Sequence, residues 1–192
     1  MNRRVLGRAV DRLAGICDGQ AMRDTLVLTL IGNDRTGLVQ SLAERLSSLG
    51  ANWEEAKMAR LAGQFAGILL VTVEASKTDE LVASLRTLDA AGLQVTARRT
   101  AAPEPSGGHS VFKLQVTAND RPGIVRDVSR VLAERGVNVE DLETEVTSAA
   151  MSGGSLFTCR ATIHAPGGVA LDDLRGRLEA LGSELMVDLT SA

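Results

Sequence analysis

The sequence predicts an α+β protein made of two copies of one β-α-β-β-α-β unit. One observation is a polar turn that occurs twice, at residues 33–37 (NDRTG) and 119–123 (NDRPG), 86 residues apart. A second is that each turn lies between an apolar run typical of a strand and an apolar run typical of a helix. A third is that the same offset persists beyond the turn and aligns Leu28 with Leu114. A unit that repeats in this way predicts a tandem of two small domains.

The first copy begins with a β-branched, apolar strand at residues 25–31. After the turn, leucines recur at helical spacing until Gly50, which is placed as a helix-ending glycine. The remaining elements follow from similar patterns: a hairpin of strands at 52–61 and 65–73, a helix marked by Leu81, Leu85 and Leu88, and a strand at 93–99. We place the first domain at residues 23–99.

Residues 100–110 are rich in Pro, Gly and Ser without apolar periodicity, which predicts a linker. The second domain is placed at residues 111–190 and repeats the same order of elements: strands at 111–117, 137–147, 156–163 and 184–189, with helices around 124–132 and 174–181. This order is the ferredoxin-like arrangement, in which two helices cover one face of a four-stranded antiparallel sheet. Small units with uncovered sheet edges predict a homodimer.

The composition excludes several classes of protein. The net charge of −3 and the few aromatic residues argue against direct binding of nucleic acid. Two cysteines make no disulfide framework, and no apolar run is long enough for a membrane span, so we expect a cytoplasmic protein. Residues 1–22 are expected to be an N-terminal extension outside the fold. Their basic, amphipathic pattern leaves a transit peptide as the alternative.

The two copies resemble the ACT domain, a small-molecule-binding regulatory module. The resemblance is carried by the turn followed by a helix and a G-x-N-x-E pattern at 50–54 and 136–140. Over residues 25–190 the chain is similar to the freestanding tandem-ACT family of the glycine cleavage system transcriptional repressor. The motifs that carry this similarity are NW at 52–53, MARL at 58–61, QFAG at 64–67, NVEDL at 138–142, MSG at 151–153 and ELMVD at 184–188. Thr36, where the family has proline, is a departure.

The turn has the chemistry of an amino-acid site. A helix N-terminus offers unpaired N–H groups to a carboxylate, and Asn and Asp side chains offer acceptors to an ammonium group. Glycine lets a ligand approach the backbone, so we expect Gly123→Val to impair ligand binding more than stability. If this glycine has a positive φ, valine instead destabilises the fold by itself. The resemblance implies a ligand held here, between two domains. The candidate residues are Asn33, Asp34, Arg35, Gly37, Leu38, Asn52, Asn119, Asp120, Arg121, Gly123, Ile124 and Asn138.

Structural roles compete with this interpretation. Asn and Asp before a helix are ordinary caps, and Pro122 fits a first helical position. Arg35 and Arg121 either pair with an acid of a neighbouring subunit or are solvated. His109, His164 and Cys159 have no partners at ligand or catalytic spacing, so we expect no metal, no cofactor and no catalytic residue.

The resemblance implies a non-enzymatic regulator that binds a small amino acid, glycine or similar, and acts on a transcription activator of the glycine cleavage operon. One alternative is a regulatory subunit of an amino-acid or folate enzyme, although both copies together leave no catalytic domain. The other is an interaction module without a ligand.

Overall fold

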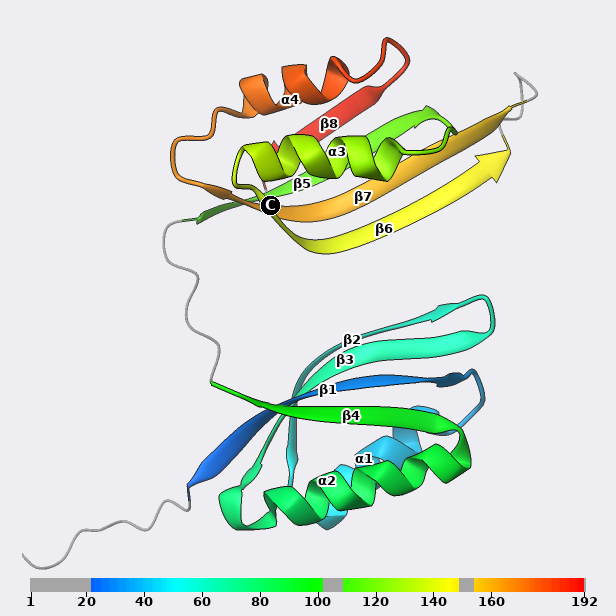
Figure 1. Ribbon diagram of the computed structural model, residues 1–192, viewed down its shortest axis with the longest axis vertical. Coiled ribbons are helices and arrows are strands. Elements are labelled where there is room, and N and C mark those ends of the chain that lie inside the picture. The colour runs from blue at the N-terminus through cyan, green and yellow to red at the C-terminus, as the bar shows by residue number, and fades with distance from the viewer. Residues whose placement is uncertain (1–21, 102–108, 149–153, 192) are drawn as a thin grey trace, which may run out of the picture. The chain divides into compact units, whose positions relative to one another are not determined.

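The chain folds into two compact units, which divide between Pro103 and Glu104. Figure 1 shows them in a computed structural model that describes residues 22–101, 109–148 and 154–191. Each unit has a four-stranded antiparallel sheet with its helices on one face. The α+β class and the tandem of ferredoxin-like units are therefore confirmed.

The first unit follows the predicted order of elements. Its bounds are β1 (Arg23–Asn33), α1 (Leu38–Ser48), β2 (Asn52–Leu61), β3 (Gln64–Glu74), η1 (Ala75–Lys77), α2 (Thr78–Arg86), η2 (Thr87–Ala91) and β4 (Leu93–Thr100). The strands lie in the order β2-β3-β1-β4. The predicted second helix ends as a short 3-10 helix, η2, which carries Leu88 into the core before Gly92 reverses the chain with a φ of 78°.

The second unit repeats this arrangement. Its elements are β5 (His109–Asn119), α3 (Ile124–Glu134), β6 (Asn138–Ser148), β7 (Ser155–Pro166), α4 (Leu171–Glu179) and β8 (Met186–Ser191), with strand order β6-β7-β5-β8. The predicted linker was too long at its ends, because Thr100 closes β4 while His109 and Ser110 open β5. Most of the linker lies outside the described residues, as do residues 149–153 and the extension before Met22.

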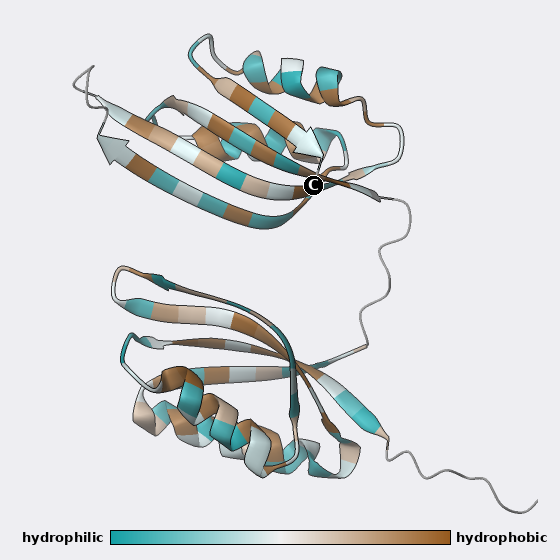
Figure 2. Cartoon of the chain, turned by 180° about the vertical axis from the view of Figure 1, so that it is seen from behind, coloured by the Kyte–Doolittle hydropathy of each residue, from teal (hydrophilic) through white to brown (hydrophobic). Residues whose placement is uncertain are grey.

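Buried and exposed side chains alternate along the strands, and the buried ones form the core of each unit. On β1, Leu26, Leu28 and Leu30 are buried and face the helices, while the residues between them face the opposite side. Figure 2 shows this alternation as bands of contrasting hydropathy along the strands. The helical leucines predicted from spacing, such as Leu42 and Leu81, fill the space between helices and sheet.

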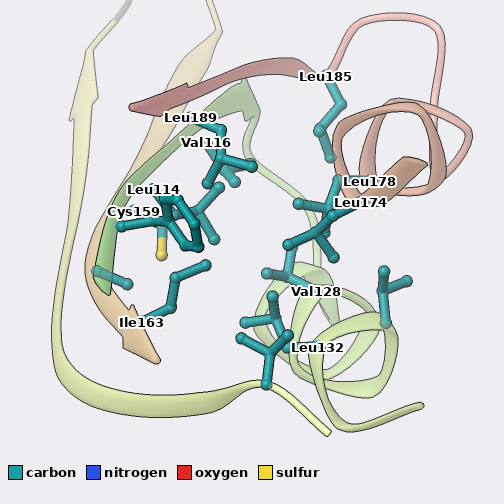
Figure 3. Close-up of a cluster of buried hydrophobic side chains, with 14 of the residues drawn as sticks. Leu114, Val116, Val128, Leu132, Cys159, Ile163, Leu174, Leu178, Leu185 and Leu189 are labelled. Carbon is teal, nitrogen blue, oxygen red and sulfur yellow. The ribbon is translucent and has the colours of Figure 1, made fainter. Parts of the chain in front are cut away.

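The core of the second unit contains the buried thiol of Cys159. Figure 3 shows its sulfur among apolar side chains from the sheet and both helices, including Leu114 and Leu132. The residue is 3 % exposed, and burial raises the pKa of the thiol. The predicted role of a small buried residue is confirmed, because a protonated, enclosed thiol is a poor nucleophile.

Both units carry an irregularity at the same place in an edge strand. The pairing register shifts between Trp53 and Glu55 on β2, and between Val139 and Asp141 on β6. Such a bulge reverses the alternation of faces along the rest of the strand. Trp53, beside the bulge, packs against the core of the first unit. No helix within the described part of the chain is long and apolar enough to cross a membrane.

Candidate functional site

The two polar turns share one backbone geometry. They connect β1 to α1 and β5 to α3, and each ends in a glycine with left-handed backbone, with φ 90° and ψ 0° at Gly37 and φ 92° and ψ 1° at Gly123. In both helices this glycine is the N-cap, and no side-chain cap is formed among the described residues. The first helical turns therefore keep backbone N–H groups and a partial positive charge available to an anion.

Several expectations for the turns need correction. Asn33 and Asn119 are the last residues of strands and do not cap the helices. Pro122 precedes the N-cap, because the left-handed residue after it delays the helix start to Ile124. The side chains of Leu38 and Ile124 are 3 % and 2 % exposed and belong to the cores. Only the backbone of these two residues is suited to a ligand.

In the first unit the polar side chains of the turn are already engaged. The Asp34 carboxylate lies 2.6 Å from Nε of Arg60 on β2, and the Asp34 N–H donates to the Gly63 carbonyl at 2.9 Å. The Asn33 side-chain oxygen accepts a hydrogen bond from the Gln64 amide at 2.7 Å. These contacts tie the turn to the β2–β3 hairpin and neutralise its carboxylate.

The arginines of the turns are exposed but held within their own units. Arg35 donates to the carbonyl of Ala91 at 2.6 Å, and Arg121 donates to the Asp127 carboxylate at 3.1 Å. Asp127 also accepts from Arg126 at 3.0 Å, and these two arginines, Arg126 more than Arg121, hold the pKa of the carboxyl below its usual value. Free solvation therefore does not describe the arginines, and their pairing with an acid of a neighbouring subunit stays a prediction.

The second turn leaves its aspartate free. The Asp120 N–H donates to the Ser155 carbonyl at 2.8 Å, as in the first unit, and the Asn119 amide donates to the Glu184 carboxylate. However, Val146 stands where the first unit has Arg60, opposite Phe157 on the neighbouring strand. Within the described ranges no cation pairs with the Asp120 carboxylate. The two turns therefore have the same shape but different electrostatics.

Arg126 adds a cation to the second turn that the motif did not predict. Its guanidinium lies 3.1 Å from the position that a Cβ on Gly123 would occupy. The aligned residue of the first unit is the neutral Gln40, whose amide donates to Glu44 at 2.8 Å. This difference could have been found in the sequence, because aligning the two copies at their common offset pairs Gln40 with Arg126.

Asn52 and Asn138 do not join the turn of their own unit. Asn52 pairs with Thr72 in the register of β2, whereas the turn lies at the other end of this strand, beside Leu61. The separation along β2 is roughly 30 Å at about 3.3 Å per residue. The reason is topological, because α1 returns the chain to the end of the sheet where β1 begins. Asn52 donates instead to Glu54 at 2.9 Å. The hydrogen bonds that Glu54 accepts from Thr72 and from Asn52 lower the pKa of its carboxyl.

The remaining candidates give no second site. A shallow depression of about 340 Å³ lies over the first turn, bounded by residues 34–40 and Phe65. His164 is paired with Glu140 at 2.5 Å, which satisfies the histidine. No cluster of His, Cys, Asp and Glu that could hold a metal ion is found in the described parts of the chain. The turns remain the best candidate site.

Comparison with known proteins agrees with this geometry. Models of the ACT domain match residues 24–98 and residues 113–179. The glycine cleavage system transcriptional repressor of Escherichia coli (strain K12) is 28% identical over 163 residues, which cover 83% of this chain and 85% of that protein.

Two solved structures share the arrangement over most of their length. An unknown protein from Galdieria sulphuraria is 29% identical, with a TM-score of 0.79, covering 89% of this chain and 99% of that chain. A candidate glycine cleavage system transcriptional repressor is 18% identical with a TM-score of 0.66 at the same coverage, which supports the fold. The matched segments coincide with the two units and include both turns, and the chain therefore belongs to the ACT-domain family, whose domain it contains twice in tandem.

Proposed function

We propose that this ACT regulatory protein is a cytoplasmic, non-enzymatic sensor of a small amino acid, glycine or similar. In this proposal it controls a partner protein, a transcription activator of glycine cleavage genes. The E. coli relative bears the name of a glycine cleavage system transcriptional repressor, which supports this assignment. The two ACT domains account for most of the chain, so the sensor role needs no catalytic domain.

One observation carries the proposal. Both units present the same left-handed glycine at an uncapped helix start, behind the same Asn-Asp-Arg sequence. The positive φ at this position requires glycine, which has no side chain to cap the helix. An uncapped N-terminus that is kept in both copies is suited to a carboxylate supplied by a ligand.

The second turn has the better chemistry for an amino acid. The uncapped N–H groups after Gly123 suit the carboxylate of the ligand. Arg121 and Arg126 share the single Asp127 carboxylate, which leaves an excess positive charge beside them. The Asp120 carboxylate, which pairs with no cation among the described residues, suits the ammonium group. In the first unit Asp34 is neutralised by Arg60, so it has less to offer a cation. We infer that the second ACT domain binds the amino acid more tightly.

Asn52 and Asn138 enter the proposal only through an interface. Within one unit each lies at the opposite end of the sheet from the turn. These asparagines contribute to a ligand site only if a unit of a homodimer places them beside the turn of another unit. In such an arrangement the ligand favours the assembly that completes its site.

A thermal-shift panel of free amino acids tests the proposal. A ligand that binds only the folded state stabilises it by about 2.7 kcal/mol at a hundred times its dissociation constant. We expect glycine and its small neighbours, alanine and serine, to raise the melting temperature and bulky amino acids to have no effect. If no amino acid shifts the transition, the sensor function is wrong and a ligand-free interaction module becomes the better description.

A further inference from the structure

The helix-free faces of the two sheets differ in polarity although the folds are the same. At six positions the first sheet is apolar where the second is polar or charged. The pairs are Val27 and Lys113, Ile31 and Thr117, Ala59 and Glu145, Ala66 and Thr158, Ile68 and Arg160, and Leu70 and Thr162. The pairing register aligns β3 with β7 at an offset of 92 residues (158 − 66), because the connection before β7 is longer than the one before β3. Polar residues remain on the face of the first sheet at Thr29 and Lys57, the neighbours of Ile68. This face is therefore more apolar in the first copy than in the second.

No helix in the described part of the first unit covers the apolar face of its sheet. Ile31 and Ile68 lie on adjacent strands and are 48% and 51% exposed, although they occupy the middle of the sheet. The same face of the second sheet forms a polar hollow of about 370 Å³ lined by residues such as Lys113, Asp188 and Arg160. An apolar patch on one of two duplicated surfaces indicates that this surface is covered by a partner.

One row across the first sheet carries opposite charges at its two ends. The pairing register places Glu55 on β2, Leu70 on β3, Val27 on β1 and Arg98 on β4 side by side. Three strand spacings of roughly 4.8 Å separate the ends by about 14 Å, too far for Glu55 to reach Arg98 in the same sheet. Neither side chain forms an ion pair among the described residues.

We propose that this face, defined by Glu55, Val27, Ile68, Leu70 and Arg98, packs against the same face of a second copy of the chain. A two-fold axis parallel to the strands reverses their lateral order, so β2 of one copy lies over β4 of the other. Glu55 then meets Arg98 of the second copy, and the reciprocal pair forms on the other side. Leu70 meets Val27 between them. Sheets stack face to face in this way about 10 Å apart in sandwich folds.

The row favours a second copy over other occupants. A surface with one negative and one positive end is complementary to itself under a two-fold rotation, as an isologous interface requires. The corresponding face of the second domain is a poor cover, because burial would desolvate Lys113 and Arg160 against apolar side chains. The inference goes beyond the proposed function and does not depend on amino-acid sensing.

Charge exchange in the full chain tests the pairing. We expect Glu55→Arg and Arg98→Glu each to raise the dimer dissociation constant at least tenfold, because each places like charges together. An equimolar mixture of these two variants should dimerise again, since only the heterodimer has two opposite pairs. The double variant Glu55→Arg/Arg98→Glu should dimerise alone. Sedimentation velocity and light scattering measure all four cases.

Controls separate the interface from unfolding. Ile68→Arg introduces the residue that the second copy carries at 160, so it suits the fold and should abolish the dimer while circular dichroism stays native. Asp141→Arg and Thr190→Glu, at the aligned positions of the second sheet, should leave the dimer intact. A monomeric parent protein, a dimer that survives Ile68→Arg, or a mixture that stays monomeric would overturn the inference. These results can be interpreted even if no amino acid shifts the melting temperature, because the proposed dimer does not depend on a ligand.

Discussion

Gly37 and Gly123 are required by the backbone before any ligand is considered. Their φ values of 90° and 92° lie in the left-handed region, where a Cβ clashes with the following carbonyl. This geometry changes the expectation for Gly123→Val, which will destabilise the fold by itself and cannot report on ligand binding alone. The turn needs each glycine for its backbone conformation, and the same lack of a side chain also lets a ligand approach closely.

We expect Gly37→Ala and Gly123→Ala each to lower the free energy of unfolding by about 1–2 kcal/mol. Steric crowding is not the main cause, because a Cβ on Gly37 would meet nothing within 4 Å and a Cβ on Gly123 would meet only the flexible end of the Arg126 side chain, at 3.1 Å. Gly176→Ala is the matched control, since this glycine lies within α4 without a positive φ and alanine favours a helix by about 1 kcal/mol. Urea unfolding measures the free energy of unfolding of all three variants. An unchanged value for Gly37→Ala would show that the turn adopts another backbone conformation without cost.

The two aspartates of the turns should respond differently to neutralisation. Asp120→Asn should weaken amino-acid binding by about 1.5–3 kcal/mol, the range for a hydrogen bond to a charged group, with the melting temperature of the free protein unchanged. Asp34→Asn removes an exposed ion pair with Arg60 and should change stability by less than about 1 kcal/mol, with little effect on binding. Titration calorimetry measures binding by both variants. If Asp34→Asn weakens binding more than Asp120→Asn does, the main site lies in the first domain.

At the scale of elements, the sequence was sufficient wherever local pattern decides structure. The bounds of β2 match the prediction from alternation and turn residues, and the buried helical leucines follow the predicted spacing. The bulges beside Trp53 and Val139 were not predicted, because a register shift depends on the partner strand. For the same reason the pair of Asp34 with Arg60 could not be read from the chain, since hairpin register brings these residues together.

The aligned leucines of β1 and β5 test whether the units are energetically separate. Leu28 and Leu114 are 0% and 2% exposed, each in its own core. We expect Leu28→Ala and Leu114→Ala each to destabilise by about 2–5 kcal/mol, and each to move a different calorimetric transition. A single transition that both variants shift equally would show that the two domains unfold together.

At the scale of the whole molecule, a ligand site completed by two units links binding to assembly. Asn52 and Asn138 lie far from the turns of their own units, so a site that uses both features joins separate units. Linkage is reciprocal: a ligand that stabilises an assembly is itself bound more tightly by that assembly.

We therefore expect the affinity for glycine to rise with protein concentration across the range where the assembly that completes the site forms. Calorimetric titrations at dilute and concentrated protein measure the effect. Ile68→Arg should leave it unchanged, because a two-fold axis parallel to the strands keeps the Asn52 ends of the two first sheets together and away from both turns. An affinity independent of concentration would place the whole amino-acid site within one unit.

Trp53 gives the two domains different optical properties. It is the only tryptophan of a chain without tyrosine, and it packs against the core of the first domain beside the bulge. Intrinsic fluorescence therefore reports on the first domain, while the second is silent to it. A spectroscopist can follow one half of a duplicated protein without a label, and the double variant Trp53→Val/Val139→Trp would reverse which half is seen.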